Sequence, residues 1–219
     1  MFRRLVLALI LLPCLAAAAQ AGAWSRGKGK TFIASSGQIE GPDSYGFYRQ
    51  TFTLYAEHGL SDRLTAGADL GGDGTRMSKI IGFLRWPLRP EARTVKLAFE
   101  MGAGQVQAQN VLRPGLSLGR NLSLWDRNGW LALDGRTILF GGANIALESD
   151  FTFGLSTTRK TKLILQVQAG HPVVGDAYAR FAPSFIYETR PGQHIEFGLS
   201  QMVYGGRAQG VKLGLWRSF

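Results

Sequence analysis

The residues best suited to catalysis in this sequence are its histidines and the serines and acids near them. His194, Glu196 and Ser200 occur at even spacing, so in a β-strand their side chains would share one face, as a base, an orienting acid and a nucleophile must. His194 and Ser200 are six residues apart, and about 20 Å along an extended strand is beyond hydrogen-bond reach. A residue of another strand, such as Ser184, would be needed to complete the site. The spacing therefore predicts no enzyme.

Two other kinds of reactive site are also not expected. His58 precedes Ser61 and Asp62, a composition typical of a turn, and the third histidine is His171. The glycine-rich segments GGDGTR and GAGQ lack the lysine and the helix of a phosphate-binding loop, and are more typical of strand ends. The sequence predicts no metal site and no cofactor.

Charged side chains at alternating positions are the remaining candidates for chemistry. Both signs are interleaved among them, so in strands they would either line an aqueous passage or neutralise one another as a structural network. The pattern leaves both readings open. These residues are Arg49, Glu57, Asp69, Lys79, Arg85, Lys96, Glu100, Arg113, Asp134, Arg136, Glu148, Asp150, Lys162, Arg180, Glu188, Glu196 and Lys212.

The scaffold that would present these charges is all-β. Apolar–polar alternation recurs in segments of about ten residues, separated by Gly, Pro, Asp, Asn and Ser. The pattern predicts twelve strands, or ten if the weak segments near Val111 and Asn144 do not form. The expected strands cover residues 30–39, 47–58, 63–71, 77–86, 95–108, 111–120, 128–138, 144–155, 161–170, 177–188, 193–203 and 208–219.

Each predicted strand has one apolar and one polar face. Leu163, Leu165 and Val167, for example, alternate with Lys162 and Gln166. A closed antiparallel up-and-down barrel would satisfy every backbone group of such strands. The alternation alone does not say which face is inside: a soluble, lipocalin-like barrel would turn its apolar face inward, whereas a transmembrane barrel would turn it outward.

The N-terminus favours export. Arg3 and Arg4 precede an apolar run over residues 5–15, and Ala21-Gly22-Ala23 matches the small-residue pattern of a cleavage site. We expect residues 1–23 to be a signal peptide and residues 24–219 to be a single barrel domain. Cys14, the only cysteine, follows Pro13 rather than the small residue of a lipoprotein signal, so acylation is not expected. The mature chain would then carry no thiol.

Charge does not indicate a nucleic-acid partner. The full chain has a formal net charge of +10, and loss of the two arginines of the signal peptide leaves +8. A secreted chain without a basic helix or an aromatic and basic platform is not expected to bind nucleic acid.

The C-terminus suggests the phase that the apolar face meets. The chain ends in GVKLGLWRSF, in which Val211, Leu213 and Leu215 alternate with other residues and Phe219 is last. This segment resembles the C-terminal strand of Gram-negative outer-membrane β-barrels. It departs from that pattern at Arg217, because the aromatic residue, Trp216, is one step off register. A bulge at the terminus, or an Arg217 side chain that reaches the headgroups, would accommodate the difference.

The resemblance implies a location and partners. It places the chain in the bacterial outer membrane, with outer-membrane lipids around it and with both termini in the periplasm, and the terminal strand would be read by the barrel-assembly machinery. The periplasmic turns would then be basic. They carry Arg63, Arg89, Arg93, Arg120, Arg127, Arg159, Lys160 and Arg190 against Asp62, Glu91 and Asp126. The outer loops carry Glu40, Asp43, Asp73 and Asp176 against Arg76 and Arg207. The basic rim either contacts anionic headgroups or cell-wall polymers or is simply solvated.

A narrow passive channel for small polar solutes is the function that these features favour. Twelve strands lie between eight-stranded barrels, which are filled by side chains, and 16-stranded porins, which hold a wide channel. The predicted loops are too short for capture of a large ligand. The alternatives are a non-conducting barrel that stabilises the envelope and, less favoured, a barrel-surface lipid hydrolase or a soluble periplasmic barrel.

Overall fold

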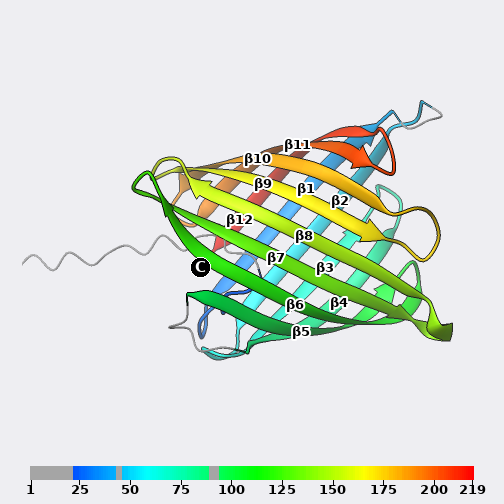
Figure 1. The fold of residues 1–219 in the computed structure, drawn as a ribbon, viewed down its shortest axis with the longest axis horizontal. Coiled ribbons are helices and arrows are strands. Elements are labelled where there is room, and N and C mark those ends of the chain that lie inside the picture. Colours follow the sequence, from blue (N-terminus) through cyan, green and yellow to red (C-terminus); the bar gives the residue numbers. More distant parts are fainter. Residues whose placement is uncertain (1–21, 43–45, 89–93) are drawn as a thin grey trace, which may run out of the picture.

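The computed structural model is a closed, twelve-stranded antiparallel β-barrel (Figure 1). It describes residues 22–42, 46–88 and 94–219. Each strand pairs with its neighbours in the sequence, and β1 closes the barrel against β12. The strands are β1 (Thr31–Gly41), β2 (Arg49–Gly59), β3 (Thr65–Gly72), β4 (Met77–Pro87), β5 (Val95–Val106), β6 (Gln109–Leu124), β7 (Arg127–Phe140), β8 (Ile145–Ser156), β9 (Thr161–His171), β10 (Tyr178–Arg190), β11 (Gln193–Tyr204) and β12 (Gln209–Ser218), with a short 3-10 turn, η1 (Gly141–Ala143), between β7 and β8. In the part of the chain that is described, no helix is long and apolar enough to cross a membrane.

The predicted fold and strand number are confirmed, and the ten-strand alternative is wrong because β6 and β8 both form. Two predicted connections are also wrong. Gln107 and Ala108, expected at the end of a strand, form the β5–β6 turn, with φ angles of 50° and 63°. Residues 121–124 were expected in a turn but extend β6, with Leu122 opposite Gly129 and Leu124 opposite Arg127. The connection is reduced to Trp125 and Asp126, whose φ angles of 50° and 58° are those of a two-residue hairpin turn.

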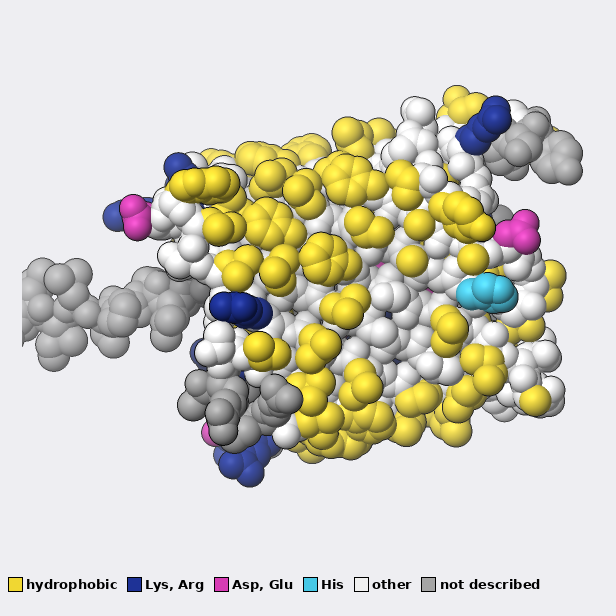
Figure 2. Space-filling model, in the orientation of Figure 1, with side chains coloured by type: hydrophobic (Ala, Val, Ile, Leu, Met, Phe, Trp, Pro, Cys, Tyr) yellow, Lys and Arg dark blue, Asp and Glu magenta, His cyan; other side chains and the backbone are white. Residues whose placement is uncertain are grey.

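The outer wall of the barrel is apolar. Leu116, Leu147, Leu199 and Val211 all point away from the lumen, and each exposes more than half of its surface. Figure 2 shows this apolar covering over the wall, with basic side chains gathered toward one end. The orientation is the reverse of the one that a soluble barrel with an apolar interior would require.

The inner wall is less uniformly polar than the alternation predicts. Ile81, Trp130, Ile138, Ile164 and Ile186 point inward and are at least nine-tenths buried. Alternation predicted polar residues at these positions. A lumen filled by side chains has a dry interior, so an apolar residue that points inward packs there as it would in a globular core.

The two ends of the barrel differ in their connections. At one end, which we call the terminal end, β1 begins and β12 ends. The Thr31 backbone N–H donates there to the Phe219 carbonyl at 2.7 Å. At the opposite end, the β3–β4 connection is closed by Asp73, which accepts hydrogen bonds from the Thr75 hydroxyl at 2.6 Å and the Thr75 backbone at 2.8 Å. These bonds hold the pKa of Asp73 below its ordinary value. The predicted rim residues Asp43, Arg89, Glu91 and Arg93 lie outside the described residues.

The C-terminal strand is regular. Its register with β1 and β11 runs without a shift through Arg217, so the bulge considered from the sequence does not form. Trp216 points into the lumen, where its indole N–H donates to Glu196 at 3.0 Å, whereas Arg217 points outward with its guanidinium 5.7 Å from the centre of the Phe219 ring. The off-register aromatic residue is therefore a lumen residue.

Candidate functional site

The lumen contains a buried network of ion pairs between side chains of β2–β7. Arg85 donates to Glu57, and to Glu100 at 2.6 Å. Arg113, which is fully buried, donates to the other oxygen of Glu100 at 2.9 Å and to Asp69 at 2.5 Å. Each guanidinium thus bridges two carboxylates through its two terminal nitrogens, and the two guanidinium groups share Glu100.

Further ion pairs and a tyrosine extend the network. Lys79 pairs with Asp69 at 3.0 Å, and Arg136 pairs with Asp150 at 3.1 Å. Tyr55 donates to Glu57 at 2.5 Å and accepts from Arg85 at 2.9 Å. Removal of one member would leave an unpaired charge in a closed space, so the network fixes the shape of this half of the lumen.

A second charged cluster lies toward the end opposite the termini. Glu40 is 4% exposed and pairs with Arg49 at 3.0 Å and with Arg180 at 3.1 Å. Ser200 donates to the same carboxylate at 3.2 Å. The cluster ties β1 and β2 to β10 and β11, past the intervening β12, on the inner face of the barrel.

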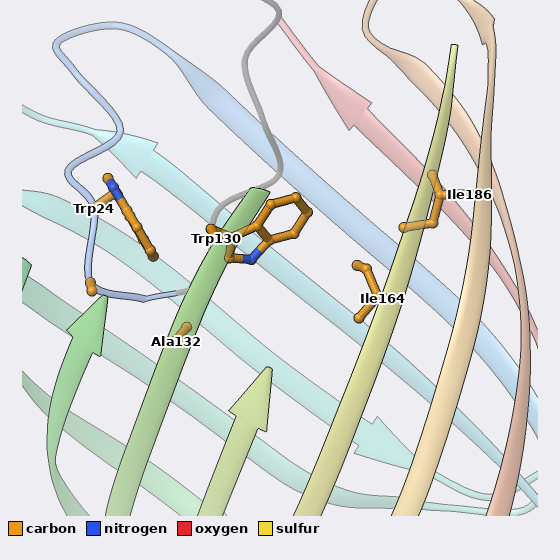
Figure 3. Close-up of a cluster of buried hydrophobic side chains, with 6 residues drawn as sticks. Trp24, Trp130, Ala132, Ile164 and Ile186 are labelled. Carbon is orange, nitrogen blue, oxygen red and sulfur yellow. The ribbon is translucent and has the colours of Figure 1, made fainter. Parts of the chain in front are cut away.

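The segment that precedes β1 enters the lumen at the terminal end. Ala23 and Trp24 are 1% and 8% exposed, and they pack in an apolar cluster with Trp130, Ala132, Ile164 and Ile186 (Figure 3). Arg26 pairs with Glu57 of the network, and its guanidinium lies 4.4 Å from the centre of the Phe32 ring. We call residues 22–26 the plug segment.

Three glycines accommodate the plug segment. Gly27 and Gly29 have a φ of 77°, which favours glycine, and they turn the chain from the lumen into β1. Gly119 of β6 faces Trp24: a Cβ atom there would lie 2.4 Å from the ring and 2.7 Å from the Ala23 Cβ. The barrel wall is therefore recessed where the indole lies against it.

Beside the network, the lumen holds a cavity of about 270 Å³. Its walls come from β1, β2 and β7–β12, and Gly22 and Arg26 of the plug segment also border it. Phe32, Trp130 and Trp216 contribute rings. Its charged groups are members of the network, the pair Lys212–Glu196, whose atoms are 2.6 Å apart, and Asp134, which accepts from Ser117. The cavity is thus both aromatic and polar.

Comparisons with known proteins show the fold. The structure superposes on an outer membrane channel from Pseudomonas putida F1 with a TM-score of 0.67 and 12% identity over 91% of this chain and 99% of that one. It superposes on the NanC porin with a TM-score of 0.64, 8% identity and coverage of 84% and 98%. For the KdgM porin in complex with disordered oligogalacturonate, the values are 0.59, 8%, 86% and 99%. No protein-family model matches the chain, and no curated protein matches it.

The chain has the fold of these barrels. Identities this low carry no residue-level correspondence, so the chemistry of the lumen must be argued from this chain alone.

The other charged residues singled out from the sequence also point inward. Ser117 donates to Asp134 at 2.5 Å, and Glu188 accepts from the Gly192 backbone at 3.2 Å. Lys162 is 8% exposed, whereas Lys96 and Glu148 are half-buried.

The histidines are not brought together with a nucleophile. His58 lies in β2, as the predicted strand over residues 47–58 has it, although its neighbours Ser61 and Asp62 suggested turn chemistry; its Nδ1 is 2.8 Å from the Thr31 hydroxyl. The Nδ1 of His171 is 3.1 Å from the Pro172 carbonyl, and the ring of His194 lies 6.4 Å from that of Trp216. Ser184 is opposite Gly198, four positions from His194. In the described part of the chain, none of these rings is hydrogen-bonded to both a serine and an acid. No group of three His, Cys, Asp or Glu side chains there could hold a metal ion.

The plug segment is the part of the site that sequence reasoning missed. Its signal is short: an aromatic residue and an arginine, Trp24 and Arg26, followed by the two glycines of GKGK. Alternation cannot identify it, because it is not a strand and its partners are scattered over many strands.

Proposed function

We propose that this chain is an outer-membrane β-barrel that acts as a narrow passive channel for small polar solutes. The strongest support is that the outer wall is apolar, whereas the lumen contains buried ion pairs. Large exposed apolar side chains around the whole barrel favour lipid over water, and a closed barrel leaves no unpaired edge in the membrane. The fold shared with outer-membrane channels and porins supports the same proposal.

Biogenesis follows from the same proposal. Residues 1–23 would be removed on export, and the terminal strand with Phe219 would be recognised by the barrel-assembly machinery. Cleavage after Ala23 would remove Gly22 and Ala23 from the plug segment and leave Trp24 and Arg26 in the mature chain, so the contact of Trp24 with Gly119 and the pair Arg26–Glu57 would persist.

The channel would be closed at its terminal end in the state described. Trp24 and the apolar cluster around it occupy that end, and Arg26 is tied to Glu57. Conduction would require the plug segment to leave the lumen, and the remaining aperture would lie beside the buried network.

The competing candidate is a barrel that stabilises the envelope and conducts nothing. The observation in its favour is the filling of the lumen by Arg85, Arg113 and their acids together with the plug segment. Both candidates share the membrane location and differ only in permeability.

Planar-bilayer recording separates the two. The purified barrel and a variant that begins at Gly27 are inserted in parallel. The proposal expects discrete current steps, larger or more frequent for the truncated variant. Bare-membrane current from both folded proteins would favour the structural barrel.

A further inference from the structure

We infer that the α-ammonium group that signal cleavage creates at Trp24 forms an ion pair with Asp134, and that this pair holds the remaining plug segment, residues 24–26, in the lumen. The inference rests on the proposed cleavage after Ala23. It deepens the proposed channel, because it assigns a contact that keeps the terminal end closed. It depends on the burial of Asp134, on the course of the chain before β1 and on the pairing of the neighbouring charges.

Asp134 is a buried acid without an ion pair. It points inward from β7, is 4% exposed and accepts a hydrogen bond from the Ser117 hydroxyl at 2.5 Å. Among the residues that the structure describes, no lysine or arginine lies within ion-pair distance of it. A buried carboxylate is destabilised unless a cation or several hydrogen bonds accompany it. Asp134 can therefore accept a further cation.

The chain before β1 passes directly over this acid. A Cβ atom on Gly22 would lie 2.7 Å from the Asp134 Oδ1 and 2.7 Å from the Ser117 Oγ, so Gly22 is in contact with the pair. Two residues later, the Trp24 ring lies against Gly119. Gly119 follows Ser117 by two positions on the inner face of β6, a spacing of about 6.6 Å along a strand. A chain that begins at Trp24 therefore begins close to Asp134, with the space of two small residues between them.

Cleavage supplies a cation at this point. Hydrolysis of the peptide bond between Ala23 and Trp24 leaves a carboxylate on the released peptide and an α-amino group on Trp24, and such a group is mostly protonated at neutral pH. Trp24 is 8% exposed, so its ammonium group enters the lumen with the ring. Loss of Gly22 and Ala23 clears the space between this group and Asp134. Two opposite charges that are both taken out of water stabilise each other when they pair.

The neighbouring charges are balanced without Asp134. The guanidinium carbon of Arg85 would lie 3.0 Å from a Cβ atom on Gly22, but Arg85 already pairs with two acids of the network. Arg136, two positions beyond Asp134 on β7, pairs with Asp150 at 3.1 Å. The ammonium group therefore meets an acid that has no partner of its own, and the existing ion pairs stay intact.

Mass spectrometry and amine labelling of the mature barrel test the inference. The full chain is exported with its signal, extracted in detergent and treated with an amine-reactive ester at neutral pH, and the labelled amines are identified by peptide mass spectrometry. The mature chain should begin at Trp24, and its α-amine should react at least about tenfold more slowly in the folded barrel than in the unfolded chain. A different first residue, or equal rates in the two states, would overturn the inference.

Asp134→Asn separates the ion pair from burial alone. The amide keeps the shape of the side chain and can still accept from Ser117, but it carries no charge, so the α-amine of Trp24 should react at least about fivefold faster than in the unmodified barrel. Asp176→Asn, in the exposed connection between β9 and β10, is the matched control and should leave the rate unchanged. Equal rates in the folded Asp134→Asn barrel and its control would show that the ammonium group has another partner.

Single-channel recording tests whether the pair holds the plug segment. The α-amine of Trp24 is acetylated in the unfolded chain, which is then refolded in detergent. Acetylation and Asp134→Asn should each raise the open probability at least about tenfold, and the two together should do no more than either alone, because they break the same contact. Additive effects, or an unchanged open probability, would overturn the inference. Absence of current from every barrel would remove the proposed channel, whereas the labelling rates would still decide whether the ion pair forms.

Discussion

Gly119→Ala should open the channel by displacing the plug segment. The added Cβ would lie 2.4 Å from the Trp24 ring, whereas carbon atoms in contact are separated by about 3.5–4.0 Å. Trp24 and residue 119 therefore cannot both keep their positions. Neither the ion-pair network nor the strand register involves the side chain of residue 119, so the barrel itself should be unaffected.

The size of the effect follows from the burial of Trp24. The indole is 8% exposed, and complete burial of a large apolar side chain contributes about 1.5–3 kcal/mol. Loss of that contribution would shift the ratio of plugged to unplugged barrel by about tenfold to a hundredfold. The ion pair between Arg26 and Glu57 would remain, so only the contribution of Trp24 would be lost.

Single-channel recording measures this ratio as open probability. The matched control is Gly135→Ala in β7, because a Cβ at position 135 meets nothing within 4 Å. The control should behave like the unmodified barrel, and Gly119→Ala should be open far more often. An unchanged open probability in correctly folded Gly119→Ala would refute the plug.

Three further predictions concern the membrane. For topology, a cysteine that replaces Asp176 should be labelled on intact cells by an impermeant thiol reagent, and one that replaces Arg159 should not; the reverse pattern would invert the barrel. For the faces, Leu165→Arg on the outer wall should destabilise the barrel by about 2–4 kcal/mol in reversible unfolding in lipid, and Gln166→Arg in the lumen by much less; equal costs would argue against a lipid-facing wall. For assembly, deletion of Phe219, which is 65% exposed, should lower the amount of folded barrel in the outer membrane, measured by heat-modifiable gel mobility, while folding in detergent is retained; normal membrane levels would show that the terminal ring is not a recognition signal.

The strands were predictable because every second residue of each strand faces the apolar surroundings of the barrel and is itself apolar. Leu163, Leu165 and Val167 face outward at three successive odd positions, so a single error of register would be visible in the sequence. The exceptions were two tight connections, the β5–β6 turn at Gln107 and Ala108 and, with the larger error, the β6–β7 hairpin. Its turn needs two residues with positive φ, and Trp125 and Asp126 are not the usual residues for it, so nothing local marked the place.

The lumen was predictable only as a set of charges. Glu57, Glu100 and Arg113 come from three different strands, and their contacts depend on the tilt and stagger of the closed barrel, which alternation does not encode. Alternation also misplaces apolar residues of the lumen. Ile164 points inward at a position expected to be polar, because it packs in the apolar cluster with the plug segment.

The central claim, that this barrel conducts small polar solutes once its plug segment is displaced, is tested most directly by sugar uptake into proteoliposomes. The unmodified chain, Gly119→Ala and Gly135→Ala are reconstituted at equal density, and entry of labelled glucose is compared with that of a labelled polysaccharide too large for the lumen. The account predicts glucose uptake that is fastest for Gly119→Ala, similar for the other two, and no polysaccharide uptake by any of them. Glucose uptake at the rate of protein-free liposomes for all three folded barrels would contradict it.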